Sequence, residues 1–275
     1  MTTSHVEVPG GRLLVQDDGS GSPIVLLHAW VADHRAWDGV VPPLTSAGYR
    51  VVRYDMRGFG ESATEDVAFS HRADLTAVMD AAGIGRAALV GNSGGGHTAL
   101  DAAIESPARV VAVVGVAAGL GGFETPPTAE EVEIFKEYER LDSRDAFDAD
   151  VLTDFEIGVW LDGPGQPFDR VPARTREQFR SMARPLNEPG HVRGRKVDLD
   201  PPANDRLADL RCPVLAIAGS LDFSDAAQTA KHLEAAAPDA RALIWPDVAH
   251  MVGMEQPDRL AEAIVGFLGP LDRWE

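Results

Sequence analysis

Residues 87–96 read Ala-Ala-Leu-Val-Gly-Asn-Ser-Gly-Gly-Gly, and the expected fold follows from this run. An apolar segment of strand length ends at Gly91, and an alanine-rich helical pattern begins after Ser93. The turn between them reads Gly-x-Ser-x-Gly, in which glycines let the strand and the helix approach closely. Such a turn presents the serine hydroxyl at the carboxyl end of the strand, beside a helix amino terminus that favours negative charge. Ser93 is therefore the candidate nucleophile.

Apolar runs of strand length alternate with helical patterns on both sides of this turn. Continuous apolar runs are typical of strands that are buried on both faces of a parallel sheet. The alternation predicts an α/β fold, with a mostly parallel central sheet and helices on both faces. The expected strands lie at 24–27, 50–54, 87–91, 110–116, 213–219 and 242–245, and the expected helices at 36–47, 70–82, 226–237 and 257–267, besides the one after Ser93. Apolar pairs on either side of residues 9–11 add a hairpin at the sheet edge.

The alternation stops between about Glu124 and Leu210, where no buried strand is expected. Amphipathic helical patterns interrupted by prolines and glycines take its place, at 128–140, 146–160 and 173–184. The sequence therefore predicts a core domain built from residues 1–123 and 211–275, with residues 124–210 inserted as a helical cap, or lid.

Charge and composition argue against several classes of partner. The chain of 275 residues carries a formal net charge of −18, which opposes binding to nucleic acid or to anionic membrane surfaces. A solvated acidic surface without any partner gives the same count. Cys212 is the one cysteine in the sequence, so no internal disulfide can form. No run is apolar enough to cross a bilayer and the start lacks a signal-peptide pattern, so we expect a cytoplasmic protein without membrane insertion.

The partners of Ser93 are expected at strand ends, because doubly wound sheets place functional loops there. A serine hydroxyl needs an adjacent base, normally a histidine that a carboxylate orients. Asp222 follows the strand at 213–219, and His250 follows the strand at 242–245. The order Ser93, Asp222, His250 is the one that accompanies a nucleophile on a sharp strand-to-helix turn. We therefore expect His250 as the base and Asp222 as the acid that orients it.

Five segments at strand ends resemble, in the right order, those of the α/β-hydrolase superfamily. They are Leu27-His28-Ala29-Trp30, residues 54–62, residues 91–95, residues 218–222, and Ala249-His250 with Glu255-Gln256-Pro257. The resemblance is to the serine esterase, lactonase and haloperoxidase-like members, and it covers the chain except for details of the lid. It implies the α/β-hydrolase fold and an oxyanion hole formed by the backbone N–H groups of Trp30 and Gly94. Members commonly have glycine at the positions of Ala29 and Val31, so the side chains of these two residues are departures that could shift the Trp30 N–H group.

The remaining histidines are expected to be structural or are left open. We expect His28 to brace the oxyanion loop, whereas His97, four residues after Ser93, could face the nucleophile or simply pack. The others show no ligand spacing with cysteines or carboxylates, so no metal is predicted. They are His5, His34, His71, His191 and His232.

Three further expectations concern the loops and the lid. Asp55 and Arg57 should pin the loop at residues 55–62 through charge-assisted hydrogen bonds. Asp225 is the expected N-cap of the helix at 226–237. Large apolar side chains in the lid are more often helix core than ligand wall, but some must close over the nucleophile. The expected pocket residues are Phe155, Trp160, Met182 and Met251.

These observations predict a cofactor-free, carboxylesterase-like serine hydrolase that acts on a small-molecule acyl substrate. The substrate is expected to be an ester, thioester or lactone, and the reaction to pass through an acyl-enzyme intermediate. The fold also hosts perhydrolysis of the cofactor-free haloperoxidase type, carbon–carbon bond hydrolysis and lyase steps, and these remain alternatives. From a different class, the alternative is a ligand-binding protein that keeps the pocket and turns over little.

Overall fold

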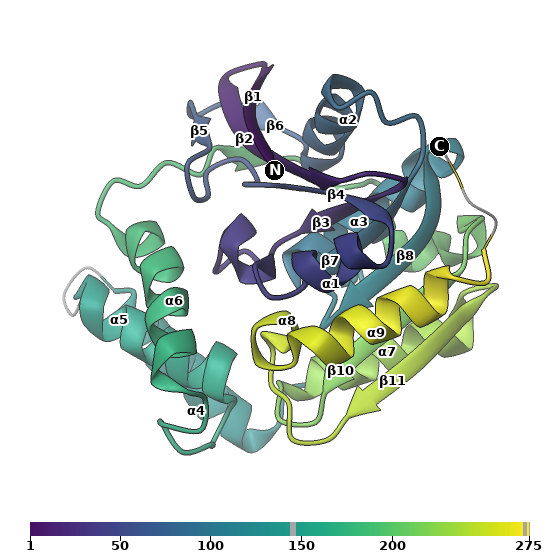
Figure 1. The fold of residues 1–275 in the computed structure, drawn as a ribbon. Coiled ribbons are helices and arrows are strands. Elements are labelled where there is room, and N and C mark those ends of the chain that lie inside the picture. Colours follow the sequence, from purple (N-terminus) through teal and green to yellow (C-terminus); the bar gives the residue numbers. More distant parts are fainter. Residues whose placement is uncertain (144–146, 272–273, 275) are drawn as a thin grey trace.

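A twisted sheet runs through the molecule with helices on both faces (Figure 1). The computed structural model describes every residue except 144–146, 272–273 and 275. The strands of the main sheet are β1 (Thr2–Val8), β2 (Gly11–Gly19), β3 (Ser22–Leu27), β4 (Tyr49–Tyr54), β5 (Ala63–Thr64), β7 (Ala87–Asn92), β8 (Val110–Val116), β10 (Val214–Gly219) and β11 (Ala240–Trp245). Their order is β1-β2-β4-β3-β7-β8-β10-β11, with β5 paired to β2. All pairs made by β2 are antiparallel and the other pairs of this sheet are parallel, which confirms the predicted hairpin and the mostly parallel sheet.

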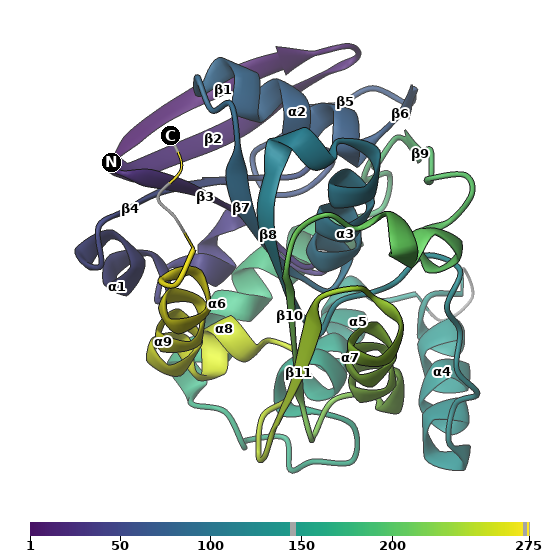
Figure 2. The ribbon, with the colours of Figure 1, turned by 90° about the vertical axis from the view of Figure 1, so that its right-hand side faces the viewer.

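Helices cover the two faces of the sheet in two groups (Figures 1 and 2). They are α1 (Val41–Ser46), α2 (His71–Ala81), α3 (Gly94–Glu105), α7 (Ser224–Ala236), α8 (Val252–Glu255) and α9 (Pro257–Leu268). One apolar cluster includes Leu100 of α3 and Leu233 of α7, and a second includes Leu44 of α1 and Ile264 of α9. Each cluster also contains side chains from the central strands, so the sheet is buried on both sides, as its continuous apolar runs predict.

The helix expected at 36–47 is instead two short pieces, which corrects the prediction. A 3-10 turn covers His34–Trp37, and α1 begins only at Val41. Pro42 and Pro43 occupy the first turn of α1. Proline has no N–H to donate and is tolerated in the first turn of a helix but not in its interior, so one continuous helix could not form.

Residues 124–210 leave the sheet and carry a separate group of helices, at the left of Figure 1. They are α4 (Ala129–Leu141), α5 (Ala149–Glu156), a π-helical turn at Ile157–Asp162, α6 (Ala173–Ala183) and a 3-10 turn at Arg184–Asn187. The expected start of the second helix, Ala146, lies outside the described residues. Beyond Asn187 the chain returns to the core, where β9 (Arg195–Lys196) pairs with β6 (Ala68–Phe69). This exposed strand of two residues is too short to leave a periodic signal in the sequence.

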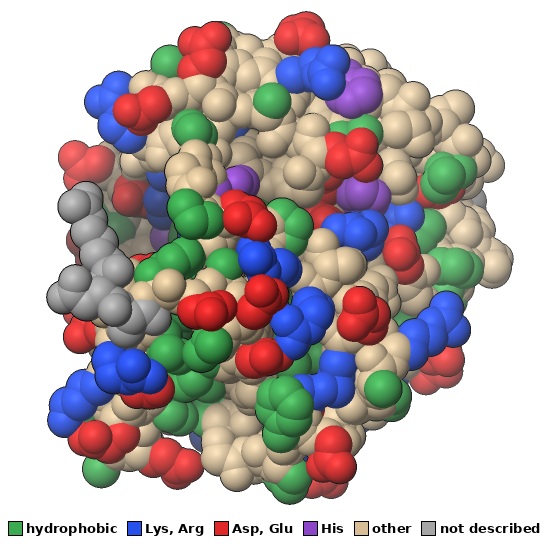
Figure 3. All heavy atoms as spheres, turned by 90° about the vertical axis from the view of Figure 1, so that its left-hand side faces the viewer, with side chains coloured by type: hydrophobic (Ala, Val, Ile, Leu, Met, Phe, Trp, Pro, Cys, Tyr) green, Lys and Arg blue, Asp and Glu red, His purple; other side chains and the backbone are tan. Residues whose placement is uncertain are grey.

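Acidic and basic side chains alternate over the face that carries α4, α5 and α6 (Figure 3). Several of them pair, as Arg184 does with Asp150 at 2.7 Å and with Glu188 at 2.7 Å. On this face the negative net charge therefore does not gather into a patch of one sign. Among the described residues, no helix has the length and apolar character needed to cross a membrane.

Candidate active site

Ser93 stands on the sharp turn between β7 and α3, in a strained conformation. Its φ of 53° and ψ of −116° are rare for a residue with a side chain. The glycines around it are required by space: a Cβ on Gly91 would lie 2.3 Å from the carbonyl of Gly95, and one on Gly95 would lie 2.2 Å from the carbonyl oxygen of Leu27. The close approach of strand and helix that the motif predicts is therefore confirmed.

Hydrogen bonds to the Ser93 backbone hold this strained turn in place. The Ser93 N–H group donates to the carbonyl oxygen of Val116 at the end of β8, at 2.9 Å. Its carbonyl oxygen accepts from the N–H groups of His97, at 2.9 Å, and Gly119, at 3.2 Å. With the backbone fixed on both sides, the position of the Ser93 side chain is set by the scaffold.

His250 and Asp222 meet at the carboxyl ends of β10 and β11. Nδ1 of His250 lies 2.8 Å and 3.0 Å from the two carboxylate oxygens of Asp222. The Asp222 side chain is fully buried and that of His250 is 8% exposed. Burial by itself lowers the pKa of His250, but the charge and hydrogen bond of Asp222, with Asp225 beyond, raise it above the ordinary histidine value. A carboxylate on Nδ1 leaves Nε2 as the nitrogen that can accept a proton.

Asn92 joins the nucleophile turn to the histidine loop, a contact that the sequence analysis missed. Its side-chain amide donates to the carbonyl oxygen of Val116, at 3.1 Å, and to that of His250, at 3.2 Å. Asn92 is the first of the two variable positions of the Gly-x-Ser-x-Gly motif, and its place directly before Ser93 was the signal that the sequence offered. It couples the positions of the two candidate catalytic residues.

Glu255 and Arg170 tie the histidine loop to the helical segment at residues 124–210. One carboxylate oxygen of Glu255 accepts from the N–H group of Ala249, at 2.8 Å, and the other pairs with Arg170 at 2.6 Å. Arg170 also donates to the carbonyl oxygens of Leu161, at 2.9 Å, and Asp162, at 2.5 Å. The π-helical turn at Ile157–Asp162 is thus fixed relative to the residue that precedes His250.

The loop that carries Asp222 is held by α4, and this corrects the prediction that Asp225 caps α7. The first turn of α7 has no side-chain cap of its own. Instead Glu131 accepts from the N–H group of Ser224, and it accepts from the Ser224 hydroxyl at 2.9 Å. Glu131 also closes the capping box of α4 with Thr128. Figure 2 shows α4 standing beside α7, an approach between distant segments that the local cap rule does not include.

Both of the expected oxyanion donors have an N–H group that is unused in the part of the chain that the structure describes. Within the described residues, neither the N–H group of Trp30 nor that of Gly94 donates a hydrogen bond. His28 braces the loop as expected: it accepts the N–H of Met56 on Nε2, at 2.8 Å, and its Nδ1 lies 2.8 Å from the carbonyl oxygen of Ala29. These two bonds fit a neutral ring, and burial lowers the pKa of His28.

Ala29 fits the oxyanion loop without strain, although related proteins commonly have glycine there. Its φ is not positive, whereas among the described residues other than glycine a positive φ occurs at Ser93, Ala117 and Asp247. The Ala29 methyl is fully buried in an apolar cluster with Met182 and Phe179 of the lid. The extra methyl group therefore packs in this cluster, and the backbone of Ala29 does not need the conformation that favours glycine.

The loop at residues 55–62 is pinned by the two side chains that the sequence predicts. Arg57 forms a bidentate pair with Asp74, at 2.7 Å and 2.9 Å. Asp55 accepts from the N–H group of Glu61, at 2.8 Å, and from His34. Both side chains are buried: the charge of Arg57 is paired with that of Asp74, and the carboxylate of Asp55 is held by the hydrogen bonds that it accepts.

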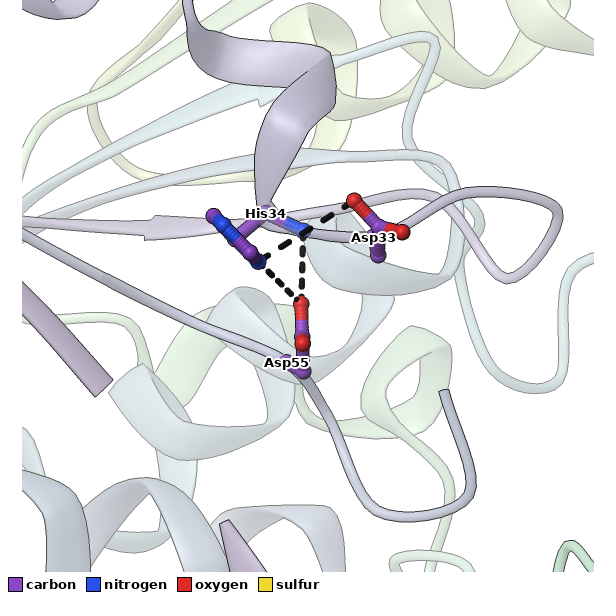
Figure 4. A group of neighbouring side chains, drawn as sticks. All are labelled: Asp33, His34 and Asp55. Carbon is purple, nitrogen blue, oxygen red and sulfur yellow. Dashed lines mark hydrogen bonds and ion pairs between the residues drawn. The ribbon is translucent and has the colours of Figure 1, made fainter. Parts of the chain in front are cut away.

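Asp33, His34 and Asp55 form a buried group with potential metal ligands within 4.8 Å of one another (Figure 4). The spacing argument that gave His34 no carboxylate neighbour was therefore wrong, because Asp55 comes from a different strand end. Nδ1 of His34 lies 2.6 Å from Asp55 Oδ1. Asp33 is engaged by the guanidinium of Arg35, at 2.6 Å. Since every carboxylate oxygen of the group already accepts from a protein donor, we interpret it as a structural brace.

His97 pairs with Asp101 on the next turn of α3. Its Nε2 lies 3.3 Å from a carboxylate oxygen of Asp101, and its ring lies 5.8 Å from that of Trp30. This arrangement favours the packing interpretation of His97, with Asp101 as its partner.

The four expected pocket residues have different neighbours. Trp160 lies over the base, with its ring centroid 4.8 Å from that of His250 and 4.9 Å from that of Phe223. Phe155 packs within the lid against Tyr138 of α4, at 6.0 Å. Met182 and Met251 are buried together where the lid meets the oxyanion loop. A cavity of about 350 Å³ adjoins Trp160, with an almost entirely apolar lining of Ile134, Phe135, Tyr138, Glu139, Val159, Trp160 and Phe223.

The sequence and the fold of this chain are similar to those of known proteins. Residues 24–263 match the model of the alpha/beta hydrolase family. A 2-hydroxy-6-oxononadienedioate/2-hydroxy-6-oxononatrienedioate hydrolase from Paraburkholderia phymatum is 28% identical, over 98% of this chain and 96% of the relative. A pimeloyl-(acyl-carrier protein) methyl ester esterase from Photobacterium profundum is 26% identical, over 92% of this chain and 97% of the relative. The crystal structure of a bromoperoxidase from Bacillus anthracis has the same fold, with a TM-score of 0.76 and 22% identity over 98% of this chain and 100% of that chain.

Proposed function

The chain belongs to the alpha/beta hydrolase family, and from this premise we propose that it is a serine hydrolase that needs no cofactor. Its proposed substrate is a small carboxylic ester, thioester or lactone, and the proposed reaction passes through an acyl-enzyme intermediate. The observation that carries the proposal is the buried pair of His250 and Asp222, at 2.8 Å, which Asn92 links to the strained strand-to-helix turn that carries Ser93. An ionised carboxylate on Nδ1 is the arrangement that makes a histidine a base on its other nitrogen.

In the proposed reaction, Ser93 Oγ forms a bond to the carbonyl carbon while His250 Nε2 takes the hydroxyl proton. The carbonyl oxygen becomes an oxyanion, which the N–H groups of Trp30 and Gly94 hold. The bond to the leaving alcohol, thiol or lactone oxygen then breaks, and His250 returns the proton to it. A water molecule hydrolyses the acyl-enzyme by the same steps in reverse, and Asp222 stabilises the histidinium throughout.

The alternatives differ in what attacks and what leaves. The Paraburkholderia relative is named for a 2-hydroxy-6-oxo acid, whose hydrolysis breaks a carbon–carbon bond, and the Bacillus neighbour is named a bromoperoxidase. Hydrolysis of a simple ester is proposed first because the groups just described are sufficient for it, and the same three residues would serve the alternatives. We favour turnover over the low-turnover binding protein, because Ala29 has no positive φ and both N–H donors are unused within the described residues. A cytoplasmic location stays a prediction.

Labelling with a fluorophosphonate tests the proposal, because only an activated serine reacts quickly with it. We expect rapid, stoichiometric labelling of Ser93, read by mass spectrometry of the digested protein, and hydrolysis of p-nitrophenyl esters. The Ser93→Ala variant is the matched control and should remain unlabelled. Slow labelling of both proteins would favour the binding protein, whereas labelling without ester hydrolysis would favour the carbon–carbon or perhydrolysis alternatives.

We further propose that residues 124–210 act as a lid and that the cavity beside Trp160 receives the acyl group. Two p-nitrophenyl esters are compared, one with a bulky acyl group and one with acetate, by the ratio of their kcat/KM values. Trp160→Ala should raise this ratio by about threefold or more, because the substitution removes the indole that limits the space near His250. Phe155→Ala is the control, since its ring packs against Tyr138 within the lid. Equal ratios in the unmodified chain and in both variants would contradict the assignment of Trp160 to the acyl pocket.

A further inference from the structure

The Trp30 ring fills the space that a side chain on residue 94 would need. A Cβ built on Gly94 would lie 2.2 Å, 2.3 Å and 2.5 Å from three ring carbons of Trp30, far inside any contact distance. Gly94 has no positive φ that would itself demand glycine. The requirement for glycine at position 94 therefore comes from the indole that lies on it, and the two residues are those whose N–H groups are proposed to hold the oxyanion.

The Trp30 ring is itself held from several sides. His71 stacks on it, with a centroid separation of 5.8 Å and an interplanar angle of 29°. Nζ of Lys196 lies 4.3 Å from the ring centroid, a cation–π distance. His97, on the helix that Gly94 begins, contacts the ring at 5.8 Å. Burial, together with nearby positive groups, lowers the pKa of His71 to about 3, so this stacked ring stays neutral at ordinary pH.

We propose that the indole of Trp30 is a positioning group that sets the separation of the two oxyanion donors. Because the ring lies directly on the Cα of Gly94, the backbone of the oxyanion loop cannot move toward the start of α3 without displacing the ring. The ring is in turn fixed by α3 through His97 and by β9 through Lys196. The inference rests on the proposed function only for its catalytic consequence, since the steric coupling of the two residues stands on geometry alone.

A double-mutant cycle tests it, with Gly94→Ala, Trp30→Ala and the double variant. Gly94→Ala should lower kcat on a p-nitrophenyl ester by about 100-fold, the effect of losing one oxyanion donor, with little change in KM. Trp30→Ala keeps both N–H groups and should lower kcat by about tenfold through looser donors. The double variant should be at least about fivefold more active than Gly94→Ala, because the new methyl group then enters the space that the ring has left. Trp30→Phe should retain more activity than Trp30→Ala.

Melting temperatures give a readout that does not depend on hydrolysis. Gly94→Ala should lower the melting temperature by roughly 3–8 °C through overpacking, and removal of the ring should restore part of this loss. Gly266→Ala is the matched control, because Gly266 lies in α9, where a Cβ meets nothing within 4 Å. Its kcat should be unchanged and its melting temperature equal to or above that of the unmodified chain.

The outcomes separate the inference from the proposed function. If the unmodified chain hydrolyses esters but the effects of the two substitutions simply multiply, the positioning role of the indole is wrong. If the chain hydrolyses no ester, the proposed function is wrong, and the melting temperatures still decide whether residues 30 and 94 are sterically coupled. A Gly94→Ala protein that fails to fold, with a double variant that does fold, supports the coupling. Failure of both to fold overturns it.

Discussion

Replacing Ser93 with alanine is expected to lower kcat by about 10⁴- to 10⁶-fold, because the nucleophile of the acyl-enzyme route is lost. The fold should survive: the backbone of residue 93 is held by Val116, His97 and Gly119, none of which touches the hydroxyl through these bonds. A change in the free energy of unfolding below about 0.5 kcal/mol is expected, which chemical denaturation can measure.

His250→Ala should be as damaging as Ser93→Ala, and the double variant no worse than either, because the two groups act as a unit. His97→Ala is the matched control, since His97 lies one turn from Ser93 but pairs with Asp101. We expect it to keep kcat within about tenfold, the loss coming from its contact with Trp30. A severe loss in His97→Ala together with substantial activity in His250→Ala would move the role of base to His97.

The order of elements and the candidate catalytic residues could be predicted because their signals are local. Gly91 and Gly95 are required by contacts with residues that are near them in the chain or at the end of the adjacent strand, and a five-residue motif contains that information. Asp222 and His250 each lie in the loop that follows an apolar run, so the parallel sheet brings them to one edge once its topology is known. The sequence showed that Ala29 stands where the resemblance leads one to expect glycine. Whether its methyl group fits depended on the packing with Phe179 and Met182, which only the structure shows.

Contacts between segments that are distant in the chain could not be predicted from the sequence, because no local rule connects them. The amide of Asn92 reaches the carbonyl oxygen of a residue 158 positions away, and Glu131 caps a helix that begins 93 positions later. The local cap rule chose Asp225 because it considers only residues beside the helix start. The coupling of Trp30 to Gly94 is of the same kind: each residue is ordinary in its own segment, and only their overlap in space makes glycine necessary.

In the helical segment at residues 124–210, the positions of the helices were likewise predictable from local pattern, whereas their contacts with the core were not. Amphipathic spacing placed its helices, and α4 begins at a capping box that lies entirely within one turn. The role of Arg170 depends on carbonyl groups of a π-helical turn and on Glu255, eighty-five positions later in the numbering. A π-helical turn inserts an extra residue into the helix ladder and often marks a functional position, here the one that carries Trp160 over the base.

Asp222→Asn is expected to lower kcat by about 10⁴-fold while leaving the loop in place. An asparagine keeps the size of the side chain, so the bond from the Phe223 N–H group, 2.7 Å in the unmodified chain, can persist. What is lost is the charge that stabilises the histidinium and the acceptor that fixes the proton on Nδ1 of His250. Hydrolysis of a p-nitrophenyl ester by this variant should therefore show a low kcat with a nearly unchanged KM.

The pH profile gives this variant a signature that a merely disrupted loop would lack. In the unmodified chain Asp222 raises the pKa of His250 against the opposing effect of burial, so kcat/KM should fall as the pH drops through a value above 6.5. Without this carboxylate, only the charge of Asp225 opposes the effect of burial, so the pKa of His250 falls and the acidic limb of the residual activity should move to lower pH. Asp225→Asn is the control: it should move the limb in the same direction but by less, with kcat nearly intact, because Asp225 acts on His250 through charge alone. An acidic limb that stays in place in Asp222→Asn, or moves to higher pH, would mean that Asp222 does not set the protonation of the base.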